Sequence, residues 1–119
     1  MSISLKLILI LFINISFLFP QSSWTLKHSS FQPDGTTQLL KDIFFVNENI
    51  GYAAGELVQN TPIVLKTTNS GASWTQIFPT NITGFSFNSL FFKNEQVGLA
   101  VGDNGKIYKT SNGGVTWTN

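Results

Sequence analysis

Residues 67–74 read TTNSGASW, residues 110–117 read TSNGGVTW, and this recurrence is the strongest structural signal in the chain. Such a segment predicts a tight turn, because its Asn side chain can accept hydrogen bonds from backbone N–H groups two residues on and its Gly accommodates a positive φ. We expect the final Trp to pack against the sheet and close the turn. The residues that build the two turns, which we expect to serve structure, are Thr67, Asn69, Gly71, Ser73, Trp74, Thr110, Asn112, Gly114, Thr116 and Trp117.

The two turns close two copies of a longer repeat, residues 40–75 and 89–118. Residues 43–45 align with residues 90–92 at a spacing of 47, and Gly51 and Gly55 align with glycines at the same spacing. The two Trp residues lie only 43 apart, so the first copy carries four additional residues between Gly55 and Lys66. A repeat of this length indicates stacked units that cover each other's faces.

Each copy predicts four short strands separated by turns. The first three are expected at residues 43–46, 51–54 and 63–67, and again at 90–92, 98–101 and 106–110; the fourth begins at the Trp. The Asn104-Gly105 pair is typical of a type I′ hairpin turn. The apolar runs at 43–46 and 90–92 do not alternate with polar residues, so both faces of these strands need a cover.

Four antiparallel strands in about 45 residues correspond to one blade of a β-propeller. The sequence therefore predicts an all-β fold of about two four-stranded antiparallel blades, which form an incomplete ring and would expose apolar faces when alone.

Both turns resemble the Asp-box, also called the BNR repeat, of bacterial sialidases and many non-sialidase propellers. With their preceding glycines and Lys-Thr pairs, the two copies are most similar to the photosystem II stability and assembly factor family and related secreted bacterial repeat proteins. Asn69 and Asn112 stand where the family usually has Asp, so each turn loses a charge and keeps an acceptor. The resemblance implies that the turns lie at the blade periphery and that the function is a non-catalytic scaffold or protein-binding module.

The first 22 residues have the layout of a signal peptide: Lys6, an apolar run over residues 7–19, and a polar stretch from residue 20. That run is shorter than the roughly 20 residues that a membrane-spanning helix needs. We therefore expect a secreted or extracytoplasmic protein that starts near Ser23 and has no membrane segment after cleavage. The expected organisation is an N-terminal strand and linker at 23–39, a first repeat at 40–78 and a second at 79–119 in a truncated chain; a short subunit that closes its ring by oligomerising is the alternative.

Charge and composition exclude several classes of function. Without residues 1–22, six Lys balance six acidic residues, so no basic surface for nucleic acid or acidic lipid is expected. The chain has no Arg and no Cys, and its one histidine is His28, so neither a sialidase arginine cluster nor a His-based metal site or triad can be assembled. Nearly all the carboxylates fall in predicted turns, which is unlike a glycosidase pair. We expect no catalytic centre, cofactor or metal.

The longer loop of the first repeat is the best candidate for a binding site, because loops on rigid scaffolds carry function. The partner expected there is a protein or a cell-surface component. Two alternatives stay open: the N-terminal fragment of a sialidase-like or other carbohydrate-active enzyme, and a small oligomeric sugar-binding propeller. The loop comprises Glu56, Leu57, Val58, Gln59, Asn60 and Thr61.

Overall fold

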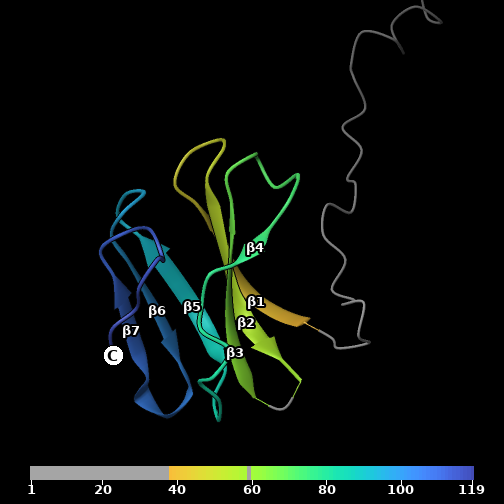
Figure 1. The fold of residues 1–119 in the computed structure, drawn as a ribbon, viewed down its shortest axis with the longest axis vertical. Coiled ribbons are helices and arrows are strands. Elements are labelled where there is room, and N and C mark those ends of the chain that lie inside the picture. The colour runs from red at the N-terminus through yellow and green to blue at the C-terminus, as the bar shows by residue number, and fades with distance from the viewer. Residues whose placement is uncertain (1–37, 59) are drawn as a thin grey trace, which may run out of the picture.

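The computed structural model describes residues 38–58 and 60–119 (Figure 1). The predicted signal peptide and residues 23–37 lie outside these ranges. Two antiparallel sheets follow one another along the chain, which confirms the all-β prediction. The first sheet consists of β1 (Gln38–Phe45), β2 (Gly51–Leu57), β3 (Thr61–Thr67) and β4 (Thr75–Gln76), and the second of β5 (Phe87–Phe92), β6 (Gly98–Gly102) and β7 (Ile107–Thr110), with the short turn η1 (Asp103–Gly105) between β6 and β7.

The fourth strand differs between the two sheets. In the first sheet β4 follows Trp74 and pairs with β3, as expected. In the second, the prediction of a full fourth strand is wrong: Thr118 forms one isolated bridge, in which it exchanges two backbone hydrogen bonds of 2.8 and 2.9 Å with Lys109. Apart from this bridge, residues 117–119 form no ladder with β7.

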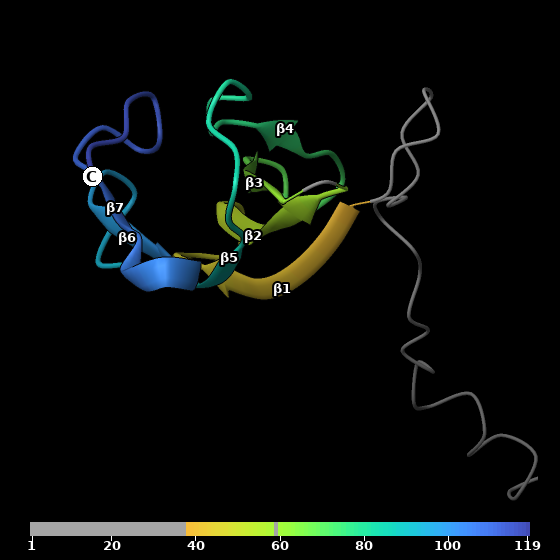
Figure 2. The same ribbon diagram turned by 90° about the horizontal axis from the view of Figure 1, so that it is seen from below.

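The two sheets lie side by side and fan apart (Figure 2). Strands β1 and β5 are neighbours, while the outer strands β4 and β7 are far from each other. Both inner strands carry a β-bulge at the same repeat position, between Leu40 and Asp42 in β1 and between Phe87 and Ser89 in β5. A bulge bends its strand and changes the direction of nearby side chains, so the polar residues at these bulges are aimed differently from the rest of the strand.

The turn between β6 and β7 has the geometry that its sequence predicts. Asn104 has φ 57° and ψ 28°, Gly105 has φ 70°, and the Lys106 N–H donates to the Asp103 carbonyl over 3.2 Å. Two consecutive positive φ angles define a type I′ turn, whose twist matches that of the two strands it joins.

The two faces of each sheet differ in whether the other sheet packs over them. We call face A the side that carries Phe44, Tyr52, Ala54 and Val64 in the first sheet and the repeat equivalents Phe91, Leu99, Val101 and Ile107 in the second. Face B is the opposite side; it carries Ile43, Phe45, Ala53 and Leu65 in the first sheet and Leu90, Phe92, Ala100 and Tyr108 in the second.

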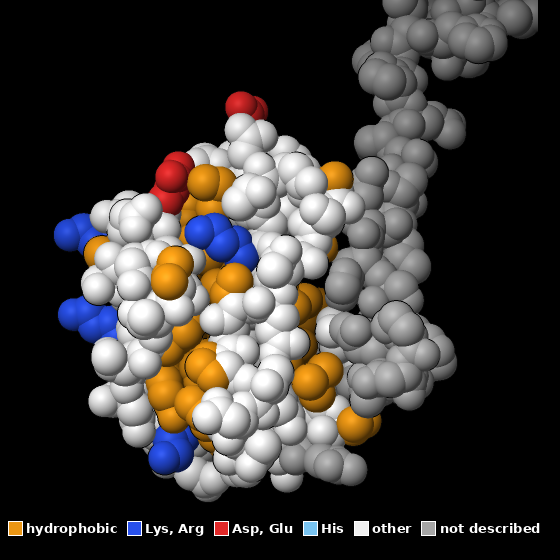
Figure 3. All heavy atoms as spheres, viewed as in Figure 1, with side chains coloured by type: hydrophobic (Ala, Val, Ile, Leu, Met, Phe, Trp, Pro, Cys, Tyr) orange, Lys and Arg blue, Asp and Glu red, His pale blue; other side chains and the backbone are white. Residues whose placement is uncertain are grey.

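The core forms where face A of the first sheet meets face B of the second. Its centre is a parallel stack of Tyr52 on Phe92, with ring centroids 3.6 Å apart. Phe78, from the segment between β4 and β5, packs edge-on against Phe87 and Tyr108. Hydrophobic side chains also reach the surface along the seam between the sheets (Figure 3).

Candidate protein-binding surface

The first Trp-ended turn is held by a closed set of side-chain hydrogen bonds. The Thr67 hydroxyl donates to the Asn69 side-chain carbonyl over 2.9 Å and accepts the Gly71 N–H, also over 2.9 Å. The same Asn69 carbonyl accepts the Ser73 N–H, and the Asn69 amide donates to the Ser73 hydroxyl. The backbone group held by Asn69 lies four residues on, not two as expected from the sequence, because the turn spans a full loop from Thr67 to Ser73.

The second turn repeats this network atom for atom. Thr110 bonds Asn112 and the Gly114 N–H over 3.0 and 2.9 Å, and Asn112 bonds both the N–H and the hydroxyl of Thr116. Gly71 and Gly114 have φ of 82° and 91°, which is the left-handed conformation expected of them. Trp74 packs edge-on against Phe45, and Trp117 against Phe78 and Phe92, so each indole lies against the sheet.

Substitution of Thr67 by Val is expected to destabilise the fold by about 1–3 kcal/mol, because the buried Gly71 N–H then lacks an acceptor. Thr67→Ser keeps the hydroxyl and is expected to cost less than 1 kcal/mol. Urea unfolding followed by Trp fluorescence measures both variants. The equivalent change Thr110→Val should give a matching loss; a Thr67→Val protein as stable as Thr67→Ser contradicts the role of the hydroxyl.

The predicted binding loop is largely a strand extension. Glu56 and Leu57 belong to β2 and Thr61 to β3, and Leu57 pairs directly with Thr61. The four additional residues of the first repeat therefore lengthen a hairpin and do not form an open loop, because the added backbone groups find partners across the ladder. The tip is anchored: the Asn60 carbonyl accepts the N–H groups of Gly84 and Phe85 over 2.8 and 3.1 Å. Val58 is exposed beside it, and Gln59 lies outside the described residues.

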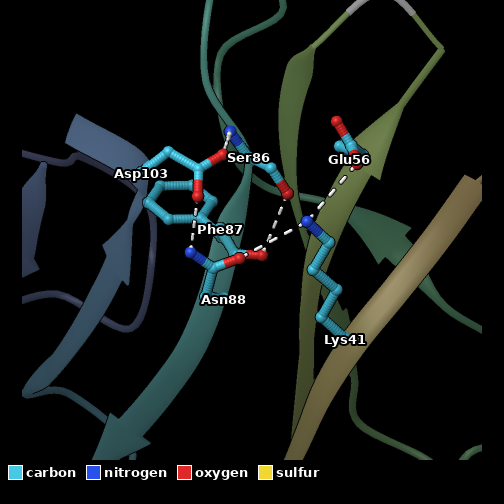
Figure 4. Close-up of polar contacts among 6 residues, drawn as sticks. All are labelled: Lys41, Glu56, Ser86, Phe87, Asn88 and Asp103. Carbon is cyan, nitrogen blue, oxygen red and sulfur yellow. Dashed lines mark hydrogen bonds and ion pairs between the residues drawn. The ribbon is translucent and has the colours of Figure 1, made fainter.

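A polar cluster joins the two sheets at the end where this hairpin lies (Figure 4). It consists of Lys41, Glu56, Ser86, Asn88 and Asp103, and we refer to it as the Lys41 cluster. The Lys41 ammonium is 3.4 Å from the Glu56 carboxylate and donates to the Asn88 side-chain carbonyl over 3.3 Å. The Asn88 amide donates in turn to Asp103 over 2.7 Å.

Within this cluster, hydrogen bonds favour the ionised form of the Asp103 carboxylate. The hydrogen bond from Asn88, followed by that from the Ser86 N–H and by the charge of Lys41, lowers the pKa of Asp103 against a partial opposing effect of desolvation. An ammonium group has three N–H donors, and the contacts with Glu56 and Asn88 occupy two of those on Lys41. The third can donate to a carbonyl or carboxylate of an incoming partner.

Asp42 forms a second bridge between the sheets, beside the bulges. Its carboxylate accepts the Ser89 hydroxyl and the Leu90 N–H over 2.8 and 2.9 Å, and the Ile43 N–H over 2.9 Å. Desolvation acts to raise the pKa of Asp42, but these three hydrogen bonds outweigh it, so that the pKa is lowered. Sequence reasoning placed most carboxylates in solvated turns; Asp42 and Glu56 instead lie in strands.

Because the pKa of Asp42 is lowered on folding, its stabilising effect is present above its unfolded value near 3.9 and is lost as the pH falls through the folded value. We expect Asp42→Asn to cost about 1 kcal/mol at pH 7, since neutral hydrogen bonds are weaker than charged ones. The difference from the unsubstituted chain should shrink between about pH 5 and 3. Urea unfolding at several pH values measures this, with the exposed Glu48→Gln as control; a difference that is independent of pH contradicts the assignment.

The opposite end of the interface has its own polar contacts. The Tyr52 hydroxyl donates to the Glu95 carbonyl over 3.1 Å, and the Asn47 amide donates to the Glu95 carboxylate over 2.8 Å. Desolvation, followed by the charge of Glu95, raises the pKa of Tyr52. Lys66 donates to the Gly113 carbonyl over 3.1 Å and lies over the Tyr52 ring. The sheets are thus joined by polar groups at both ends and by aromatic rings between them.

Within residues 38–58 and 60–119, His, Cys, Asp and Glu form no group of three or more that could hold a metal ion. The same part of the chain contains no helix long and apolar enough to cross a membrane.

The two sheets are neighbouring blades of the β-propeller type, joined face to face with their first strands innermost. Among solved structures, the chain is similar to the photosystem II assembly factor YCF48, a β-propeller, in a structure described as YCF48 bound to D1 peptide. The two share 21% sequence identity with a TM-score of 0.56; the match covers 82% of this chain and 32% of that one, so the chain spans about a third of the YCF48 chain. At this identity the likeness shows the fold alone. No protein-family model and no curated protein matches the chain.

Proposed function

We propose that this chain is a non-catalytic, assembly-factor-like propeller module that holds an extended segment of a partner protein or cell-surface component. The observation that carries the proposal is the row of donors and acceptors in the Lys41 cluster, which runs across both blades at one end. A peptide backbone presents alternating N–H and carbonyl groups. The third N–H of the Lys41 ammonium can donate to a peptide carbonyl, and the remaining lone pairs of the Glu56 and Asp103 carboxylates can accept peptide N–H groups. The similar YCF48 structure, which holds a D1 peptide, supports a peptide ligand for this kind of scaffold.

The same end of the molecule favours a peptide over a sugar. Phe85 and Phe87 are buried beside the cluster, at 3% and 0% exposure. The described residues at this end therefore offer no open aromatic face on which a sugar ring could stack. Glu56 pairs with Lys41 and Asp103 with Asn88, so both carboxylates belong to the polar network that joins the two sheets.

A random peptide library displayed on phage, selected on the folded chain, tests the proposal. We expect selected peptides to lose at least tenfold in affinity for a Lys41→Ala/Asn88→Ala variant, because a hydrogen bond to a charged group contributes about 1.5–3 kcal/mol. Lys93→Ala, which removes an exposed lysine outside the cluster, should bind as the unsubstituted chain does. Fluorescence anisotropy measures the affinities, and urea unfolding checks that each variant is folded.

Two results would count against the proposal: selection of no peptide, or peptides that bind the double variant unchanged. Binding to a glycan array in place of peptides would favour the carbohydrate alternatives.

We further propose that the two Trp-ended turns are Asp-box turns and that residues 1–22 direct export, so that the module acts outside the cytoplasm. The matched networks around Asn69 and Asn112 support the first statement, and the apolar run after Lys6 supports the second. Mass spectrometry of the exported protein should give a chain that starts near Ser23. A chain that retains residues 1–22 in the exported fraction contradicts this.

A further inference from the structure

The residue pattern of the blade–blade interface occurs a second time in this chain, on two sheet faces that both expose apolar side chains. Within the interface, Val64 on face A of the first sheet and Leu90 on face B of the second are 0% and 5% exposed. Their repeat equivalents on the free faces, Ile107 and Ile43, are 54% and 58% exposed. Face A of the second sheet therefore exposes the apolar positions that are covered in the first sheet. On face B of the first sheet, Ile43 and Phe45 are exposed in the same way, while Ala53 and Leu65 are buried.

The polar contacts across the interface also have unused counterparts. Two of the side-chain contacts that join the blades are Asn47 to Glu95 and Lys66 to the Gly113 carbonyl. At the repeat-equivalent positions, the second blade carries Asn94 and Lys109, and the first blade carries Glu48 and the Ser70 carbonyl. Each of these pairs again joins a donor to an acceptor, so the free faces match in hydrogen bonding as well as in apolar surface.

Both free faces are hollowed. An open groove of about 330 Å³ lies beside β1, lined by Leu40, Lys41, Asp42, Ile43 and Ala53. On the second sheet, a groove of about 280 Å³ lies between Phe91, Leu99 and Lys109. Sheets that pack face to face interdigitate their side chains, and hollows on both faces leave room for that.

We propose that face A of the second sheet binds face B of the first sheet of a second copy of this chain, so that copies associate head to tail and continue the propeller. This contact continues the interface inside the chain, because the same apolar positions and equivalent donor–acceptor pairs recur on the two free faces. A head-to-tail contact closes into a ring when its rotation allows. This chain covers 32% of the similar propeller chain, so we expect three copies, with two blades each, to complete the ring.

The association is tested by sedimentation velocity of the full chain and of two single variants. Ile107→Glu places a charge on the free face A, and Ile43→Glu places one on the free face B. Both side chains are exposed in the single copy, so the blade pair should fold normally. We expect a species of three times the monomer mass for the unsubstituted chain and a monomer for each variant. Val115→Glu, on an exposed turn residue outside both faces, is the matched control and should still assemble.

A mixture of the two variants gives the decisive measurement. Ile107→Glu retains an intact face B and Ile43→Glu an intact face A, so an equimolar mixture should form a one-to-one dimer that neither forms alone. A monomeric unsubstituted chain at 100 µM overturns the proposal. So does an oligomer that survives in both variants, because it would be held by another part of the chain. Neither result bears on peptide binding at the Lys41 cluster.

Discussion

Replacing Tyr52 by Ala is expected to destabilise the blade pair by about 3–5 kcal/mol, the usual cost of removing a large buried aromatic side chain. Tyr52 is fully buried, stacks on Phe92 and reaches the Glu95 carbonyl with its hydroxyl. A small domain is stable by roughly 0.05–0.15 kcal/mol per residue, so a loss of this size removes a large part of the total stability. Urea unfolding monitored by Trp fluorescence and near-UV circular dichroism measures it.

The matched control is Tyr52→Phe, which keeps the stack and removes only the hydrogen bond to Glu95. We expect a loss of about 1 kcal/mol for this variant. If Tyr52→Ala and Tyr52→Phe cost the same, the stack with Phe92 does not hold the two sheets together.

Replacing Gly55 by Ala is expected to cost about 3 kcal/mol, the upper end of the usual range for overpacking. A Cβ atom at Gly55 would overlap the backbone carbonyl of Leu39 in β1, and a backbone group cannot move aside as the end of a side chain can. At the equivalent Gly102 a Cβ would meet the Ser86 carbonyl, so Gly102→Ala should behave alike. Thermal and urea unfolding measure both variants.

Gly105→Ala separates steric overlap from backbone strain. Gly105 has φ 70°, and a Cβ atom there would have no neighbour within 4 Å. This variant is therefore expected to lose only the 1–2 kcal/mol of left-handed strain. A Gly55→Ala protein that is no less stable than Gly105→Ala contradicts the proposed overlap with β1.

Most residues of the candidate surface were not predicted, although the repeat contains a pattern that indicates them. Lys41 and Asn88 occupy the same repeat position, as do Asp42 and Ser89, and all four are polar residues next to apolar strand cores. That spacing of 47 places them at equivalent points of two neighbouring sheets, where they meet across the interface. The prediction of a binding loop at residues 56–61 rests on its greater length and on the tendency of loops to carry function, and neither distinguishes an open loop from a hairpin whose added residues pair.

The sequence by itself determined the two-unit all-β plan, the type I′ turn at Asn104-Gly105 and the left-handed glycines of the Trp-ended turns. These features depend on residues within a few positions of each other, because turn hydrogen bonds and backbone φ preferences are local. Only the tertiary structure decided which face of each apolar strand is covered, and that Tyr52 meets Phe92 and Asp42 meets the backbone of Leu90. Those contacts join residues more than 35 positions apart, so they depend on how one sheet is placed against the next, which no local pattern specifies.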